Sequence, residues 1–418
     1  NRHDIYPLTG RAVTHDLVRQ DVQLFRDANI NFIRTSHYPP REDFLELCDE
    51  YGIYVEDEIA VAFVYQSIQP TMNDPDFTPA YMGQFTEMIE RDRSHPCVIM
   101  WSLANESFWG RNFQKQYDYA RAADPGRPTI FSYPITQPQG TEAYQIWSLH
   151  YANWDRDPSA MGDNFEQGQA WGKRAPVIHD EFAHIPCYDL VEHRRDPAIR
   201  EFWGESIKRW WESIFPTQGA LGCAIWGSID DVMIDSEGYT RYRGWGIIDG
   251  WRRKKPEYWL TKKGYSPIRV PEAALANPGA GQPLLVPVKN WFDHTNLNEI
   301  DVKWSAGDQA GTLQGPDVAP HVEGNLQFPA RDWQDGDVLS LSFHRAVNPP
   351  TDGGLMVDAY RLTIGNEPLS TPQAQGPAPT VVESDTAFTV SGTDFTLVFS
   401  KRTGLITTGT YKGLEVVK

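Results

Sequence analysis

Apolar runs and amphipathic stretches alternate along residues 1 to about 265. The runs are short and end in polar residues, as buried parallel strands do; they cover 31–34, 53–56, 98–101, 129–132, 146–149, 177–180 and 223–226. Between them, apolar residues recur with the spacing of a helix face. Two such stripes are Phe44, Leu47, Cys48, Tyr51 and Tyr81, Phe85, Met88, Ile89, and a third stripe follows the N-cap and N1 residues Asp196 and Pro197. This alternation predicts a parallel α/β fold.

The seven predicted strands fall one short of a (β/α)8 barrel, whose eight units occupy roughly 250 residues. The missing strand is the first, which would lie at or just before Asn1. No G-x-G-x-x-G follows any of the runs, so a nucleotide-binding sheet has no support. We therefore predict a TIM barrel over residues 1–267 that lacks most of its first strand.

The pattern changes after Pro267. Residues 268–285 are rich in Pro and Gly, and short alternating segments follow at 302–304, 338–343 and 359–364. Such segments, separated by Gly, Asp, Asn and Pro, are typical of a β-sandwich. We predict an immunoglobulin-like β-sandwich over 268–366. Over 367–418 we predict a linker and the beginning of a C-terminal β domain, with strands near 388–390 and 395–399.

The charge of the chain narrows the set of partners. It holds 56 acidic and 38 basic residues, a net charge of −18 at pH 7. A nucleic-acid footprint needs the opposite sign, so we expect no nucleic-acid partner. No apolar run reaches the about 18 residues of a membrane span. The four cysteines lie far apart without a CxxC, so we expect buried free thiols rather than a zinc site or a disulfide framework. The cysteines therefore do not identify the redox compartment of the protein.

Two predicted strands end in carboxylates. Active sites of such barrels lie at the carboxyl ends of the strands, where one run is followed by Asn105-Glu106 and another by Asp180-Glu181. Two facing carboxylates are the minimum for glycoside hydrolysis, because one protonates the leaving oxygen and the other attacks the anomeric carbon or activates water. The alternative is that each glutamate caps a helix or forms a salt bridge. The residues alone leave both interpretations open.

Other strand ends add histidines and aromatic residues. Histidines stand at several of these ends, and the chain holds 15 Trp, whose faces can stack on sugar rings although most Trp residues pack in cores. No H-x-H or H-E-x-x-H occurs, so a metal-dependent hydrolase has little support. The strand-end groups are Asn1 to Asp4, Arg34 to Tyr38, Asp57-Glu58, His150-Tyr151, His184 and Trp226.

Several of these segments together resemble glycoside hydrolase family 2, and its bacterial β-galactosidases in particular. The likeness covers the barrel throughout and, more weakly, the sandwich and the last segment; the upstream sugar-binding jelly roll and first sandwich of the family have no counterpart in this sequence. The segments that carry it are Asn1-Arg2-His3-Asp4, Ser36-His37-Tyr38-Pro39, Asp57-Glu58, Trp101-Ser102-Leu103-Ala104-Asn105-Glu106-Ser107, Asp180-Glu181-Phe182-Ala183-His184 and the stretch from Trp245 to Pro267.

The resemblance implies a role for each candidate residue. Glu106 becomes the general acid/base and Glu181 the nucleophile of a retaining, exo-acting hydrolase of terminal β-D-galactosides, with a carbohydrate as its substrate partner. Other residues surround that pair. The implied contacts are Asn105 to the sugar 2-hydroxyl, Tyr151 and Arg34 to Glu181, His3, His37 and His184 to hydroxyls, and Trp226 as the platform beneath the sugar.

The sequence departs from the family pattern at the metal sites. The Glu-x-His of magnesium-dependent β-galactosidases falls on Ala62 and Val64, and the sodium-holding Asn falls on Trp245, so we predict no metal and no cofactor. The β-glucuronidase signature Asn-x-Lys is also missing, since Arg243-Gly244-Trp245 stands there. A β-glucuronidase or β-mannosidase of the same family, and a non-catalytic carbohydrate-binding protein, stay as alternatives. A homo-oligomer is also open, because family members are often oligomeric.

Overall fold

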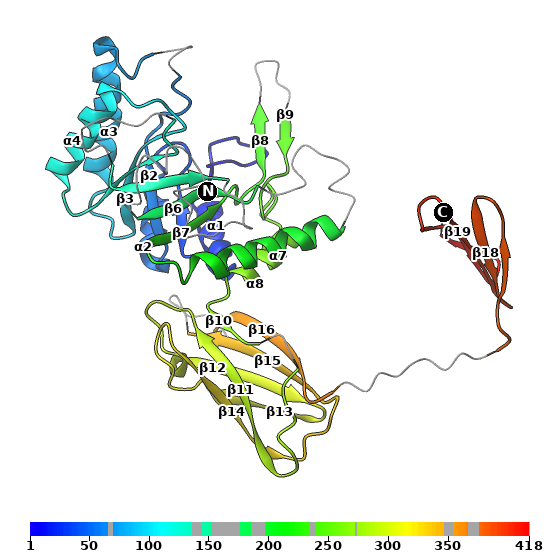
Figure 1. Cartoon of the computed structure of the whole chain (residues 1–418). Helices are drawn as coiled ribbons and strands as arrows, with labels where there is room; N and C mark the ends of the chain where they lie inside the picture. Colours follow the sequence, from blue (N-terminus) through cyan, green and yellow to red (C-terminus); the bar gives the residue numbers. More distant parts are fainter. Residues whose placement is uncertain are drawn as a thin grey trace. The chain divides into compact units, whose positions relative to one another are not determined.

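The chain forms two compact units, Asn1–Asn366 and Glu367–Lys418, which we describe separately. A computed structural model describes residues 1–65, 70–135, 144–151, 176–184, 197–234, 240–271, 274–346, 354–366 and 376–417. In the first unit, a ring of parallel strands precedes two antiparallel sheets (Figure 1). Among the described residues, no helix has both the length and the apolar character needed to cross a membrane.

A parallel sheet with strands in the order β1 to β7 forms the barrel. Each strand coincides with one of the predicted apolar runs, so the predicted barrel is confirmed. The strands are β1 (Phe32–Arg34), β2 (Tyr54–Glu58), β3 (Val98–Asn105), β4 (Thr129–Ser132), β5 (Ile146–His150), β6 (Val177–Phe182) and β7 (Ala220–Ile225).

The first residues of the chain lie between β1 and β7. The backbone N–H of Arg2 donates to the carbonyl oxygen of Arg34 at 3.0 Å. On the other side, the side-chain amide of Asn1 donates to the carbonyl oxygens of Asp180 and Ala224 at 2.8 and 3.1 Å. These residues therefore bridge the two border strands in the gap where the sequence predicts the end of the first barrel strand.

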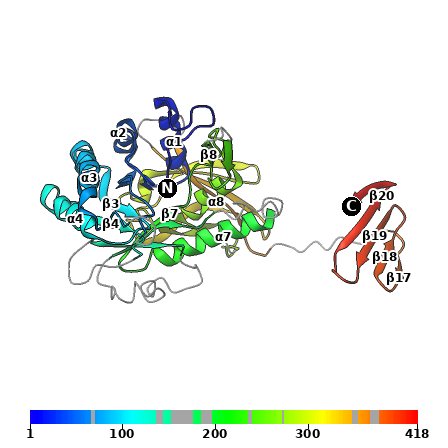
Figure 2. The ribbon, with the colours of Figure 1, turned by 90° about the horizontal axis from the view of Figure 1, so that it is seen from above.

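Helices lie around the outside of the ring (Figure 2). The predicted stripes on α2 and α3 are buried, as are Trp203, Ile207 and Trp210 of α7. Asp196, predicted as an N-cap, lies outside the described residues. The helices are α1 (His15–Asp27), α2 (Glu42–Tyr51), α3 (Thr78–Asp92), α4 (Arg111–Ala123), α7 (Pro197–Ile214) and α8 (Pro256–Gly264), with the 3-10 turn η1 (Pro75–Phe77).

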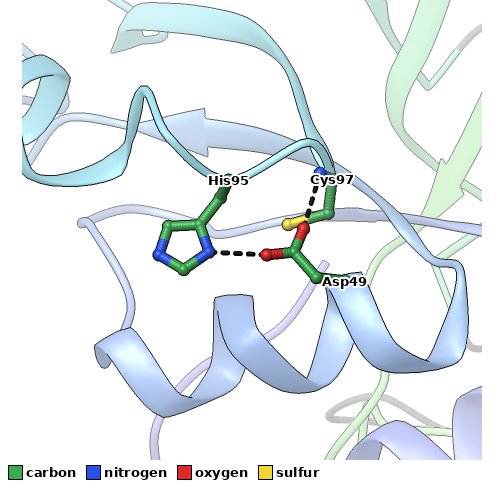
Figure 3. Close-up of side chains that lie close together, drawn as sticks. All are labelled: Asp49, His95 and Cys97. Atoms are coloured by element: carbon green, nitrogen blue, oxygen red, sulfur yellow. Dashed lines mark hydrogen bonds and ion pairs between the residues drawn. The ribbon is translucent and has the colours of Figure 1, made fainter.

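Asp49 joins α2 to the loop that leads into β3 (Figure 3). Its Oδ2 accepts a hydrogen bond from Nδ1 of His95 at 2.7 Å, and its Oδ1 accepts one from the backbone N–H of Cys97 at 2.7 Å. The Cys97 thiol donates to the carbonyl oxygen of Leu45 at 3.5 Å. Both carboxylate oxygens are thus used in a clamp at the amino end of β3, the end opposite Glu106.

Two antiparallel sheets form the predicted sandwich. One has the order β10-β11-β14 and the other β13-β12-β15-β16. Along β11 buried and exposed residues alternate, and the buried ones join a core that includes Val302, Phe328 and Leu341. The strands are β10 (Ile268–Arg269), β11 (Gln282–Asn290), β12 (Ile300–Ala306), β13 (Gln309–Gln314), β14 (Glu323–Arg331), β15 (Val338–Arg345) and β16 (Leu355–Thr363), with the turn η3 (Leu297–Glu299).

Two smaller β elements complete the description. A hairpin of β8 (Asp231–Ile234) and β9 (Thr240–Arg243) follows the barrel sheet. The second unit is an antiparallel sheet in sequential order, and β18 and β19 confirm the strands predicted near 388–390 and 395–399. Its strands are β17 (Thr380–Glu383), β18 (Ala387–Ser391), β19 (Phe395–Ser400), β20 (Ile406–Tyr411) and β21 (Leu414–Val417). The predicted linker at 367–375 lies outside the described residues.

Candidate active site

Four neighbouring barrel strands turn sharply at their carboxyl ends. Glu106, Tyr133, Tyr151 and Ala183, which follow β3, β4, β5 and β6, have φ angles of 38°, 51°, 50° and 52°. A left-handed backbone at a residue with a side chain costs on the order of 1–3 kcal/mol and persists where its surroundings impose it. Strain of this kind gathers at functional sites, and here it gathers at the end of the barrel where such sites lie.

Two glutamates meet at this end of the barrel. Glu106 follows β3 directly, whereas Glu181 lies within β6. A carboxylate oxygen of each lies within 4.8 Å of the other and of a ring nitrogen of His150. Neither glutamate caps a helix that the structure describes, since the N-cap of α4 is Gly110 and α7 begins at Pro197. The two carboxylates therefore face each other across the barrel mouth.

Glu181 is held through both of its oxygens. Arg34 donates to Oε2 at 3.0 Å, and the hydroxyl of Tyr151 donates to Oε1. Burial alone would raise the pKa of Glu181, but His150, Arg34 and the Tyr151 hydrogen bond outweigh it and lower the pKa. Burial and the adjacent Glu181 raise the pKa of Tyr151, which keeps its hydroxyl protonated. Glu181 is thus an oriented carboxylate at neutral pH.

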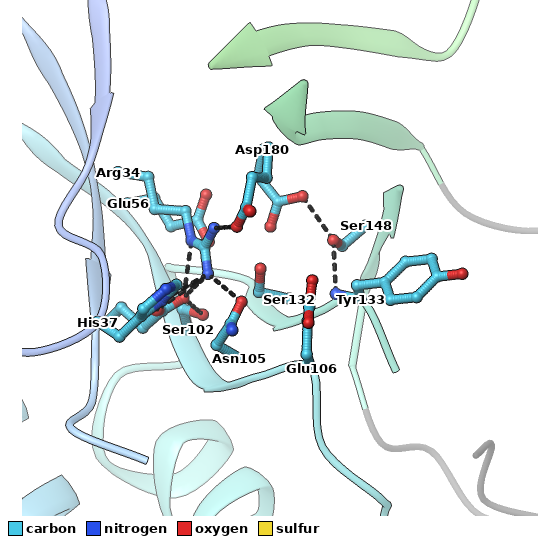
Figure 4. Close-up of polar contacts among 12 residues, drawn as sticks. Arg34, His37, Glu56, Ser102, Asn105, Glu106, Ser132, Tyr133, Ser148 and Asp180 are labelled. Carbon is cyan, nitrogen blue, oxygen red and sulfur yellow. Dashed lines mark hydrogen bonds and ion pairs between the residues drawn. The ribbon is translucent and has the colours of Figure 1, made fainter. Parts of the chain in front are cut away.

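Arg34 lies at the centre of a buried polar network (Figure 4). It donates to both oxygens of Glu58, at 2.8 and 3.0 Å, and to Oδ1 of Asn105 at 2.7 Å. Burial would raise the pKa of Glu58, but Arg34 and His37 bring that pKa down to about 2. One guanidinium therefore fixes Glu58, Asn105 and Glu181 together.

Two further carboxyl groups, those of Glu56 and Asp180, lie close to this network. Glu56 is fully buried, with its Oε1 3.7 Å from Nε of Arg34. Burial and the neighbouring Asp180 raise the pKa of Glu56 well above its usual range. Asp180 is also fully buried, and its Oδ1 accepts a hydrogen bond from Ser148 at 2.5 Å. Among the described residues, the interior beneath the two facing glutamates therefore holds more carboxyl groups than guanidinium groups.

Glu106 has surroundings unlike those of Glu181. Nδ1 of His150 lies 2.9 Å from Oε1 of Glu106, and Nε2 of the same ring lies 3.0 Å from the hydroxyl of Ser132. The Glu106 side chain is 26% exposed, against 7% for that of Glu181. Glu106 thus contacts an imidazole and solvent, while Glu181 contacts a guanidinium in a nearly closed setting.

Aromatic and imidazole rings form a wall beside the glutamates. His37 stacks on Trp226 with centroids 5.3 Å apart and an interplanar angle of 18°. His3, whose Nδ1 lies 3.1 Å from the carboxylate of Asp231, approaches Trp226 edge-on at 5.2 Å. Ring contacts of 5.7, 5.9 and 5.9 Å continue from Trp226 through Trp245 and His184 to Tyr151. The wall therefore ends at the residue that holds Glu181.

The structure brings the candidate residues together in this one region. They are His3, Arg34, His37, Asn105, Glu106, Tyr151, Glu181, His184 and Trp226. The sequence places Glu58, His150 and Asp180 at strand ends but assigns them no role in the site, and it does not place Trp245 there either. The position at a carboxyl strand end pointed to Glu58 and His150, which are the last residues of β2 and β5, but it does not say what each side chain contacts. Trp245 follows β9 and carries no such signal.

Two groups of described side chains lie close enough to share a cation: Asp49, His95 and Cys97, and Glu106, His150 and Glu181. In both, the hydrogen bonds given above already use the carboxylates. Ala62 and Val64, where the resemblance would put magnesium ligands, lie beside the β3 end: Ala62 bridges Asn105, and the backbone N–H of Val64 donates to Ser107 at 3.0 Å. Their hydrocarbon side chains offer no ligand atom.

Comparison with known proteins places the barrel in a family. Residues 1–270 match the family described as glycosyl hydrolases family 2, TIM barrel domain. The chain is 27% identical over 447 residues to a beta-galactosidase of Priestia megaterium, covering 100% of this chain and 41% of that protein. It is 42% identical over 253 residues to a beta-galactosidase of Vibrio cholerae, covering 59% and 23%. The chain thus spans less than half the length of these relatives.

Solved structures agree in fold. A GH2 beta-galacturonidase from Eisenbergiella tayi, bound to galacturonate, matches with a TM-score of 0.50 and 26% identity over 63% of this chain and 50% of that chain. An FMN-binding beta-glucuronidase from Faecalibacterium prausnitzii matches with a TM-score of 0.53 and 19% identity over 88% and 56%. At 19% identity, the likeness to the beta-glucuronidase shows a common fold only.

Proposed function

This chain belongs to glycoside hydrolase family 2, and from that premise we propose that it is a retaining, exo-acting β-galactosidase. The proximity of Glu106 and Glu181, whose carboxylate oxygens come within 4.8 Å, carries the proposal. Retaining glycosidases hold their carboxyl groups about 5–5.5 Å apart, and inverting ones about 6.5–9.5 Å to leave room for a water. A closest approach of the two carboxylates to within 4.8 Å fits the closer, retaining arrangement and supports direct attack by Glu181 on the sugar.

The proposed reaction has two steps. First, an oxygen of Glu181 attacks the anomeric carbon while the glycosidic C–O bond breaks, and the proton of Glu106 passes to the leaving oxygen. Second, Glu106, now a carboxylate, takes a proton from water as that water attacks the anomeric carbon and releases Glu181. The hydrogen bonds from Arg34 and Tyr151 keep Glu181 ionised and aimed for the first step.

The residues around Glu106 and Glu181 can bind an uncharged sugar through its hydroxyl groups and its ring face. Arg34 binds Asn105 through its amide oxygen, so the NH2 group of Asn105 is the end that can donate to a sugar 2-hydroxyl. Trp226 offers an aromatic face for the apolar C–H surface of a sugar ring, and His3 and His37 pack against that same Trp. His184, beside Tyr151 and Trp245, completes the proposed binding residues.

Charge favours a galactoside over a uronide. The cation in contact with Glu181, Arg34, is shared with Glu56 and Glu58, and Asp180 lies among them. The raised pKa of Glu56 removes it from the charge balance, but the carboxylates of Glu58 and Glu181, both with a lowered pKa, still outnumber the one guanidinium of this group among the described residues, and a uronate carboxylate would be repelled. The beta-galactosidase names of the relatives agree with this choice. The name of the solved beta-galacturonidase supplies the alternative that an assay must exclude.

Hydrolysis of a panel of 4-nitrophenyl β-glycosides by the full-length protein tests the substrate. We expect cleavage of the galactoside ahead of the glucuronide, galacturonide and mannoside. NMR of the first-formed sugar should show the β-anomer, since double displacement retains configuration. First formation of the α-anomer would overturn the retaining mechanism, and preference for a uronide would overturn the charge argument.

Two matched alanine variants test the roles of the glutamates. With azide present, Glu106→Ala should form the β-glycosyl azide, because azide replaces water in the second step. Glu181→Ala should form the α-glycosyl azide, because azide then attacks the free face of the sugar directly. The same azide anomer from both variants would refute the proposed division of roles.

A further inference from the structure

His150 contacts both catalytic candidates and has no role in the reaction as written so far. It is the last residue of β5, its ring is buried, and it opposes Glu181 in the strand register. Its Nδ1 lies 2.9 Å from Oε1 of Glu106 and 3.8 Å from Oε2 of Glu181. Only the first of these distances is that of a hydrogen bond. His150 therefore binds Glu106 and lies beside Glu181.

The other side of the imidazole determines which nitrogen carries the proton. Nε2 lies 3.0 Å from the hydroxyl of Ser132 and 3.6 Å from Oδ1 of Asp180. The shorter contact is the hydrogen bond, and a serine hydroxyl can donate to Nε2. Asp180 already accepts a hydrogen bond from Ser148. A carboxylate oxygen can only accept, so the contact with Glu106 assigns a hydrogen to Nδ1, while Nε2 faces Ser132.

A donor at Nδ1 fits both states that an acid/base residue passes through. When Glu106 is protonated, Oε1 can accept from Nδ1–H only if the proton sits on Oε2. When Glu106 is a carboxylate, Oε1 accepts the same hydrogen bond more strongly, since its acceptor is then ionised. No change of tautomer is needed between the two half-reactions. The ring is kept in place by stacking on Tyr133, with centroids 5.0 Å apart and an angle of 18°.

We propose that His150 is the positioning residue for the acid/base: its Nδ1–H binds Oε1 of Glu106 and so directs the transferable proton to Oε2, the oxygen left for the leaving group. This inference rests on the proposed function. It predicts that His150 matters in proportion to how much a substrate needs proton donation. A general acid contributes roughly 10²–10⁴-fold when the leaving group is poor, and little when the leaving group departs unaided.

The test compares the wild type with His150→Leu and His150→Gln on aryl glycosides of graded leaving-group acidity, using the sugar that the wild type cleaves best. For His150→Leu we expect kcat/KM to fall roughly 10–100-fold on the phenyl glycoside and less than about threefold on the 2,4-dinitrophenyl glycoside. The Gln amide can still donate to Oε1, so His150→Gln should recover part of the loss. His15→Leu, which replaces an exposed histidine of α1, serves as the control.

The outcomes separate this inference from the function on which it rests. A loss that grows as the leaving group becomes poorer, with partial recovery in His150→Gln, supports the positioning role. An equal loss on every substrate, with a lowered melting temperature, assigns His150 a merely structural role and overturns the proposal, as does no loss at all. If the wild type cleaves no glycoside, the proposed function fails first and this inference falls with it.

Discussion

Replacing Tyr151 with phenylalanine removes one of the two hydrogen bonds that hold Glu181. The Tyr151 hydroxyl donates to Oε1, while Arg34 continues to donate to Oε2 at 3.0 Å. The substitution keeps the ring and its contact with His184, so the wall beside the site should persist. The change therefore isolates a single donor to the proposed nucleophile.

The size of the effect follows from the setting of this hydrogen bond. Hydrogen bonds to charged groups contribute about 1.5–3 kcal/mol. Tyr151 is 41% exposed, so solvent screens the interaction and we take the lower end, about 1.5 kcal/mol. Since one pKa unit corresponds to about 1.4 kcal/mol, the pKa of Glu181 should rise by about one unit. Glu181 has a lowered pKa in the folded protein, and losing a donor to its carboxylate moves that pKa upward.

The assay is the pH profile of kcat/KM on a galactoside with a good leaving group. Because Glu181 must be ionised to attack, the acidic limb should move about one pH unit higher in Tyr151→Phe. At pH values below the pKa of Glu181, kcat/KM of Tyr151→Phe should be about tenfold lower than that of the wild type. Tyr54→Phe is a matched control, since Tyr54 begins β2 at the opposite end of the barrel. An unmoved acidic limb in Tyr151→Phe would refute the argument that this hydroxyl keeps Glu181 ionised.

Two further substitutions probe the network and the clamp. Arg34→Lys should lower kcat/KM by about 100-fold or more and should also lower the melting temperature. An ammonium cannot bind Glu58, Asn105 and Glu181 together, so at least two charged hydrogen bonds of about 1.5 kcal/mol each are lost. Steady-state kinetics and thermal unfolding measure the two effects. Asp49→Ala should cost about 2–3 kcal/mol of stability, since it leaves the Cys97 N–H and His95 without their acceptor, yet leave kcat/KM unchanged. The exposed Asp308→Ala is its control, and a normal denaturation midpoint in Asp49→Ala would contradict the clamp.

The barrel was predictable because its strands carry their own signal. A fully buried parallel strand is a short apolar run, as in β4, where all of 129–132 are buried. The carboxyl ends of such strands converge, so the residues after each run could be gathered into one candidate site before any contact was known. Glu106 and Glu181 were selected in this way, and the family resemblance supplied the distinction between their roles.

The contacts within the site were not predictable, because they depend on register and on the turns after the strands. His150 reaches Glu106 because β5 pairs with β6 in a register that opposes His150 to Glu181, and because Glu106 adopts a left-handed backbone. The sequence does not indicate which neighbouring residue the side chain at the end of a strand will contact. Trp245 reaches Trp226 through the path of the chain after β9, for which the sequence offers no periodic signal.

The surroundings of the two glutamates argue for their roles independently of the family. Glu181 is nearly buried and receives hydrogen bonds from a guanidinium and a hydroxyl, both of which favour the ionised form. Glu106 receives a hydrogen bond from His150 alone among the described side chains, and it has solvent on its other side. The hydrogen bonds that Arg34 and Tyr151 donate to Glu181 stabilise a negative charge on that carboxylate, and this agrees with the proposal that Glu181 is the nucleophile.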